Sequence, residues 1–115
     1  MEIIKSNLPE NVDMETLYNM FESEDRKPMK DLAGTVIPVQ YFAIYTDENA
    51  KGEYVKLLAV MADTGAVTVT NSASAIRAME RLTKLCEMAK QKLTAIEVTK
   101  DKSRNNREFI SVKLA

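Results

Sequence analysis

The sequence predicts a mainly β protein with helices, an α+β chain in which five strands form a small barrel. Three observations predict this class. Alternating apolar and polar residues recur in five short segments after residue 34, one long amphipathic helix separates the third segment from the fourth, and a short acidic helix precedes them all. An open α+β sheet would have the same order of elements and stays an alternative. The 115 residues are enough for one domain with one main core.

An acidic segment opens the chain. Residues 1–12 lack a clear period and are expected to form an extended arm. Asp13 can cap a short helix over roughly residues 14–23, because apolar residues recur there at helical spacing. Residues 24–30 are charged, contain a proline and are expected to form a linker. The sequence therefore predicts an arm with a short helix over residues 1–30 and a barrel domain over residues 31–115.

Three strands are expected after this segment. The first is rich in β-branched and aromatic residues, and Pro38 within it marks an edge or a bulge, because proline cannot donate to the ladder. Polar turns rich in aspartate, asparagine and glycine separate the three runs. The predicted strands cover residues 35–45, 53–62 and 66–70.

The clearest helix of the chain follows, with Asn71 and Ser72 at its N-cap and an expected end near Lys92. One face of this helix is apolar and the other is charged, as expected of a helix packed on a core. Two more strands are expected over residues 94–100 and 108–114, joined by a polar loop. Five strands with a helix between the third and the fourth are typical of an OB-like barrel, a partly open Greek-key fold.

The composition argues against several classes of protein. No apolar run approaches the ~20 residues that cross a bilayer, and the N-terminus shows no signal-peptide pattern, so a cytoplasmic protein is expected. Cys86 is the one cysteine and cannot form an intrachain disulfide. The chain has no histidine, the commonest general base and transition-metal ligand. We therefore expect no enzyme, no metal and no cofactor.

The charges are distributed unevenly along the chain. Residues 1–31 hold eight acidic and four basic side chains, whereas residues 32–115 hold nine acidic and twelve basic ones, although the net charge is only −1. A basic body of this kind is one mark of a surface that binds nucleic acid. For a difference this small, chance is an equally good explanation.

Six short segments also stand in an informative order. They are Asp31–Gly34, Tyr41–Tyr45, Gly52–Val55, Asp63–Gly65, Thr70–Ser72 and Ser103–Phe109. In this order they resemble the small single-stranded-DNA-binding proteins of phages of Gram-positive bacteria, over roughly residues 30–115. The resemblance implies an OB-fold that binds single-stranded DNA without sequence specificity during phage DNA replication or recombination. Asn106 departs from the glycine that this family favours in its last turn.

Binding an unpaired strand takes flat rings on which bases stack and cations close to the phosphates. In OB-folds the site lies across strands two and three, between the loops that join strands one to two and four to five. The candidate rings are Tyr41, Tyr45, Tyr54 and Phe109. The candidate cations are Lys51, Lys56, Lys100, Lys102, Arg104, Arg107 and Lys113. Burial in a second small core under the N-terminal helix is the alternative role for the rings, and a solvated hairpin tip is the alternative for the basic loop.

The favoured function is a non-catalytic binder of single-stranded DNA, with replication proteins as further partners. The alternative is an OB-like module that docks a replication or host protein through the acidic helix and the aromatic strand. Nothing positive supports a small hydrolase built on carboxylates. The N-terminal segment has two expected roles that the sequence leaves open: it covers the basic face in competition with DNA, or it joins two chains into a homodimer.

Overall fold

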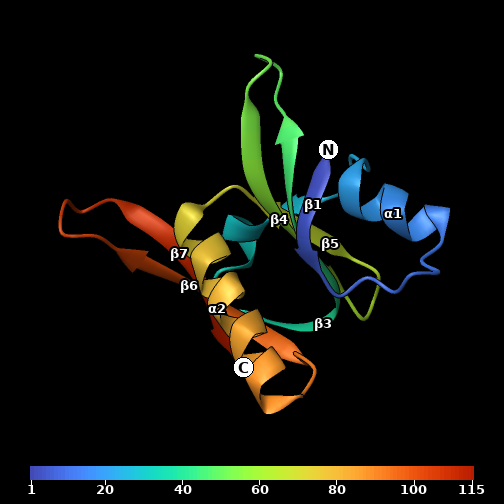
Figure 1. Cartoon of the computed structure of the whole chain (residues 1–115). Helices are drawn as coiled ribbons and strands as arrows, with labels where there is room; N and C mark the ends of the chain where they lie inside the picture. Colours follow the sequence, from blue (N-terminus) through green and yellow to red (C-terminus); the bar gives the residue numbers. More distant parts are fainter.

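The computed structural model describes residues 1–115 as a mainly β chain with two α-helices (Figure 1). The elements are β1 (Glu2–Ser6), α1 (Met14–Phe21), β2 (Lys27–Pro28), the short 3-10 helix η1 (Met29–Leu32), β3 (Val36–Glu48), β4 (Tyr54–Ala62), β5 (Val67–Thr70), α2 (Ala73–Ala89), β6 (Ala95–Lys102) and β7 (Glu108–Leu114). The predicted class, mainly β with helices, is confirmed. The five strands expected from alternation correspond to β3–β7, and the expected helices correspond to α1 and α2.

The strand count differs from the prediction, because the structure has seven strands rather than five. Helix α2 therefore lies between the fifth and sixth strands of the chain. The additional strands come from the segment predicted as an arm and a linker: β1 pairs antiparallel with β3, and β2 pairs in parallel with β5. Both are too short to show a period of their own, and they form because a longer strand offers them a partner.

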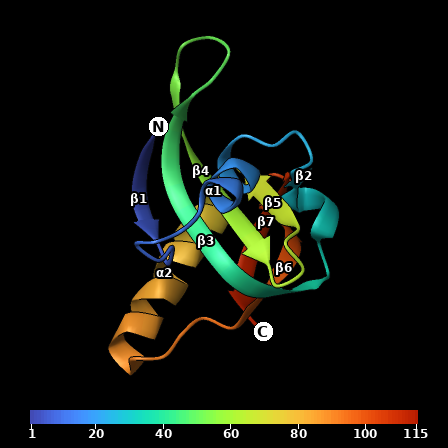
Figure 2. The same cartoon turned by 90° about the vertical axis from the view of Figure 1, so that its right-hand side faces the viewer.

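The strands form one mixed sheet that curls into a half-barrel (Figure 2). Their order is β2-β5-β4-β3-β6-β7, and β1 also pairs with β3. The 13-residue strand β3 changes partner along its length: residues 36–38 pair with β6, and the stretch from Val39 onward pairs with β4. A register shift between Val39 and Tyr41 lies beside Pro38. This irregularity bends the strand and lets one sheet curl.

The two faces of β3 and β4 contact separate cores. Inside the curl, α2 packs on the larger core, to which Phe42 and Ile44 of β3 belong. On the outside of the curl, α1 packs on a smaller core. Its members are Met20, Phe21, Ala43, Tyr45, Ala59, Met61 and Val67. Because successive side chains of a strand point to opposite faces, the alternation predicted for this stretch is present, but both faces are covered.

Helix α2 begins as the sequence predicts and ends slightly earlier. The Ser72 hydroxyl accepts a hydrogen bond from the Ala75 N–H, as an N-cap does. Lys90 adopts the left-handed conformation with φ 55°, and its N–H turns back to carbonyl oxygens of the last turn. At the start of the helix, Ser74 Oγ donates to the Ile110 carbonyl of β7 over 2.6 Å. This bond holds the helix against the edge of the last strand.

Acidification is expected to weaken the N-terminus of α1. The carboxylate of Asp13 accepts a hydrogen bond from the Thr16 N–H at 2.8 Å, and hydrogen bonding to Thr16 lowers the pKa of Asp13 below its ordinary 3.8. A lowered folded-state pKa contributes stability above the unfolded value, and this stability is lost as the pH falls through the folded value. Asp13→Ala should therefore lower the thermal midpoint at neutral pH, and the difference from wild type should shrink below pH 3.8.

The control is Asp13→Asn, which keeps a capping oxygen without the charge and should show no such pH dependence. A loss that is equal at neutral and at strongly acidic pH would contradict this.

Candidate nucleic-acid interface

The structure does not bring the four candidate rings together. Tyr45 is only 1% exposed, and its ring meets Phe21 of α1 edge to face with the ring centroids 4.8 Å apart. Tyr41 points to the same side of β3 and is half-buried against the same core. The prediction that Tyr45 offers a stacking surface is therefore wrong, because α1 covers this face of the sheet. The alternative role, burial under the N-terminal helix, describes both tyrosines.

Tyr45 instead connects α1 to the segment that follows it. Its hydroxyl accepts a hydrogen bond from Arg26 Nη1 at 3.2 Å, and the same nitrogen donates to the Met20 carbonyl at 3.1 Å. Arg26 Nε donates to the Ser23 carbonyl at 3.0 Å. Burial raises the pKa of Tyr45, and the positive charge of Arg26 opposes that shift. The guanidinium thus fastens residues 26–30, called the strap below, to the end of α1.

The β3–β4 hairpin carries one free ring on an acidic tip. Tyr54 is 76% exposed and stands near the tip with the exposed Lys51. Lys56 on the same strand forms an ion pair with Glu80 of α2 at 2.8 Å. Residues 47–53 hold three acidic side chains and one basic one. The hairpin offers a surface for stacking, but its charges do not favour phosphates.

The β6–β7 hairpin carries most of the predicted cations. Lys100 pairs with the exposed Glu108 at 3.0 Å, and Lys113 pairs with the half-buried Glu97 at 3.7 Å. Both pairs are open to solvent, where an ion pair contributes little. Three further cations are exposed and form no ion pair with the rest of the chain. They are Lys102, Arg104 and Arg107. The hairpin therefore presents unpaired positive charge along its tip.

Asn106 stands at the turn of this hairpin in the left-handed conformation, with φ 61°. Asparagine tolerates this conformation better than most residues, so it replaces the expected glycine at modest cost. The turn is closed by the Ser103 N–H, which donates to the Arg107 carbonyl at 2.8 Å.

A groove of about 860 Å³ runs between β5 and β7, which do not pair with each other. Two distant parts of the chain supply its cations: Arg26 and Lys30 come from the strap, and Lys100 comes from β6. Phe109 of β7 also lines the groove and is 37% exposed. Asp31 and Glu108 are the acidic residues in its lining. Lys100 and Glu108 pair with each other, so this β5–β7 groove combines one aromatic residue with a net charge of +1 from Arg26, Lys30 and Asp31.

The strap cations are functional candidates that sequence reasoning missed. Arg26, Lys27 and Lys30 fall within five residues. This clustering of basic residues is the one signal in the sequence that could have identified them. The surrounding segment is strongly acidic, so the cluster was hidden in the net charge of residues 1–31. The two-residue pairing of β2 with β5 brings these cations beside the sheet, and the sequence shows no sign of that pairing.

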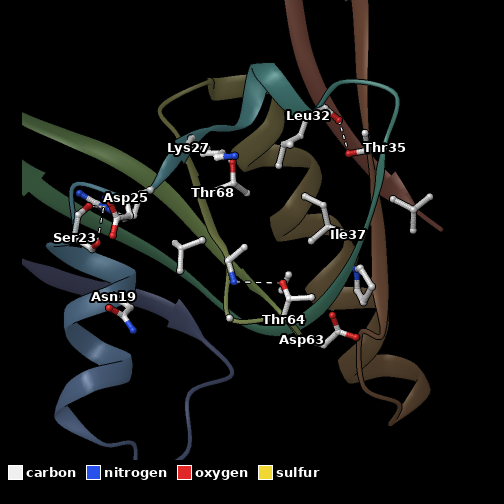
Figure 3. A pocket seen from close by; sticks show the side chains of 17 residues that line it. Asn19, Ser23, Asp25, Lys27, Leu32, Thr35, Ile37, Asp63, Thr64 and Thr68 are labelled. Atoms are coloured by element: carbon white, nitrogen blue, oxygen red, sulfur yellow. Dashed lines mark hydrogen bonds between the residues drawn. The ribbon is translucent and has the colours of Figure 1, made fainter.

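A second hollow, of about 620 Å³, lies on the other side of the strap (Figure 3). Leu32, Ile37 and Val67 give it an aliphatic interior, and no aromatic ring lines it. Its charged residues balance, with Arg26 and Lys27 against Asp25 and Asp63. The hollow is therefore better suited to a flat, uncharged group than to a phosphate.

Comparison of the chain with protein-family models, with curated proteins and with solved structures finds no match. Neither α-helix is long and apolar enough to cross a bilayer. No three side chains of histidine, cysteine, aspartate or glutamate are gathered where they could hold a metal ion. The grooves and the side chains that line them are therefore the features that indicate a function.

Proposed function

We propose that this protein binds single-stranded DNA without sequence specificity, with the β5–β7 groove and the β6–β7 hairpin as its contact surface. One observation carries the proposal. The strap and the β6–β7 hairpin, far apart in the sequence, place Arg26, Lys30 and Lys100 around the groove that holds Phe109. An unpaired strand needs a ring and cations at one surface, because a base stacks on the ring while its phosphates meet the positive charges.

The arrangement of strands supports an OB-like description. In chain order, β3–β7 are five strands with α2 after the third of them. The β3–β4 and β6–β7 hairpins then correspond to the two loops that border the ligand in OB-folds. The outer face of β3 and β4 is covered by α1 in this protein. The proposed path of the strand therefore moves from that face to the neighbouring β5–β7 groove.

The proposed binding needs no proton transfer, which agrees with a chain without histidine. Every base has a flat face, so stacking on Phe109 does not depend on sequence. The cations of the strap and hairpin release counterions from the phosphates, which makes binding sensitive to salt. Protection of single strands during phage DNA replication or recombination, in the host cytoplasm, is the role we propose for this binding.

Removing the two arginines of the hairpin tip should weaken the salt dependence of binding. We expect Arg104→Ala/Arg107→Ala to bind a fluorescein-labelled oligo(dT) about tenfold more weakly at low salt. The slope of log affinity against log salt should fall by about 1.4, because each phosphate contact on a single strand contributes roughly 0.7. Fluorescence anisotropy titrations at several salt concentrations measure both quantities.

The matched control is Lys90→Ala/Lys92→Ala, which removes two exposed cations at the far end of α2. This control should leave the slope nearly unchanged. Equal effects of the two double variants would mean that general charge, and not this hairpin, attracts DNA.

A protein-docking module is the second candidate, and α1 gives it a specific basis. Met14 and Tyr18 lie one turn apart on the helix and are 84% and 58% exposed. Deleting residues 1–30 would not test this role, because Met20 and Phe21 are part of the core. The oligonucleotide titration separates the two functions: if no DNA binding is seen even at low salt, the docking module becomes the better description.

A further inference from the structure

The strap separates the β5–β7 groove from the second hollow, and Arg26 lines both. Lys27 faces the hollow, and Lys30 faces the groove. β2 holds the strap in place, because Thr68 Oγ1 donates to the Lys27 carbonyl at 2.8 Å. A strand that leaves the groove on this side passes three cations within five residues and then reaches the hollow.

The interior of the hollow suits a flat apolar surface. Figure 3 shows Ile37 and Leu32 beside the open space, and Ala62, Ala66 and Val67 complete the aliphatic lining. Its volume of about 620 Å³ falls in the range of roughly 300–1,000 Å³ that is usual for small-ligand sites. A nucleobase, with apolar faces and a polar edge, has the matching chemistry.

The main chain of Val36 provides hydrogen-bonding groups at the rim. Thr35 accepts from the Val98 N–H, and Val39 donates to the Thr94 carbonyl. Residues at these odd positions of the strand therefore face β6, so the N–H and C=O of Val36 point the other way. No strand pairs with that side of β3 at Val36, and the residue is 55% exposed. It leaves one donor and one acceptor free at the rim of the hollow.

We infer that this hollow is a base pocket that receives one nucleobase of the bound strand. The faces of the base lie against Leu32 and Ile37, and its edge exchanges hydrogen bonds with the main chain of Val36. That a DNA strand delivers this base to the hollow rests on the proposed function. The pocket itself is tested separately with free nucleosides.

Methyl and amide NMR spectra test the pocket directly. Titration with each of the four free deoxynucleosides should shift the Ile37 and Leu32 methyl signals and the Val36 amide signal of the full chain, with saturation for at least one of them. Deoxyribose 5-phosphate, which lacks a base, should leave these signals unchanged. The inference is overturned if no nucleoside and no oligo(dT) shifts the Ile37 methyl signal, or if the sugar phosphate shifts it equally.

A filling substitution provides the second test. Ala66 is exposed and lines the hollow, so Ala66→Leu occupies part of its volume without adding a ring or a charge. We expect nucleoside affinity to fall about tenfold, the scale of one lost base contact. The matched control is Ala50→Leu, at an exposed alanine in the β3–β4 turn, which should leave the affinity within about twofold. Equal affinities for these two variants would overturn the pocket.

The pocket and the proposed function fail in different ways. If oligo(dT) binds and depends on Phe109 while the Ile37 signal stays constant, the base pocket is wrong and the proposed function stands. If nucleosides saturate the pocket while no oligonucleotide binds at low salt, the pocket stands and the proposed function is wrong.

Discussion

Replacing Phe109 with alanine is expected to weaken the binding of oligo(dT) by about one to two orders of magnitude. Phe109 lines the β5–β7 groove and is 37% exposed, so part of its surface is accessible to a base. A ring on which a base stacks contributes roughly 1–3 kcal/mol, and each 1.4 kcal/mol corresponds to about a factor of ten. Fluorescence anisotropy with a labelled oligonucleotide at one fixed salt concentration measures the change.

Two exposed tyrosines provide the comparisons for this substitution. Tyr18 is exposed on α1 and lies outside the groove, so Tyr18→Ala should leave DNA affinity unchanged. Tyr54 is the exposed ring of the β3–β4 hairpin, and its substitution tests whether the DNA strand follows that hairpin instead of the groove. If Tyr54→Ala weakens binding while Phe109→Ala does not, the strand follows the β3–β4 hairpin and the groove assignment is wrong.

Replacing Phe21 with alanine is expected to lower the free energy of unfolding by about 3–5 kcal/mol, the usual cost of removing a buried phenylalanine ring. Phe21 is 4% exposed and packs against the ring of Tyr45, so its loss leaves a cavity between α1 and β3. A domain of this size is stable by roughly 5–15 kcal/mol, so the effect is a large fraction of the total. Urea unfolding followed by circular dichroism measures it.

The same helix provides the control for this measurement. Tyr18→Ala removes a ring of similar size from an exposed position and should change the unfolding free energy by no more than about 0.5 kcal/mol. Similar values for the two variants would show that α1 is not docked in solution. The ring of Tyr45 would then be free, and the outer face of β3 and β4 would again be a candidate surface for DNA.

Local patterns in the sequence were sufficient for the elements that carry their own signal. Alternation located β3–β7, and the N-caps Asp13 and Ser72 located the starts of α1 and α2. Parity also placed Tyr41 and Tyr45 on one side of their strand, as the structure has them. These features depend on neighbours within a few residues, which a single sequence displays.

Less of the candidate site could be predicted from local patterns in the sequence. Parity groups side chains on a face but does not say what covers that face, so local patterns do not decide whether Tyr45 is exposed or packed under α1. Composition alone predicts a linker where the strap cations lie, because β2 has only two residues and exists through its pairing with β5. The polar loop predicted between the last two strands is the turn of the β6–β7 hairpin, but its position relative to the strap depends on how the sheet curls.

The sequence by itself determined the class of the protein and the order of its main strands and helices, because both follow from short-range periodicity and capping. Only the tertiary structure decided which rings are exposed and which cations meet around one groove. Those outcomes depend on contacts between segments far apart in the chain, such as α1 on β3 and the strap on β5. The same local patterns allow many such contacts, and burial of apolar surface and strand pairing decide which of them form.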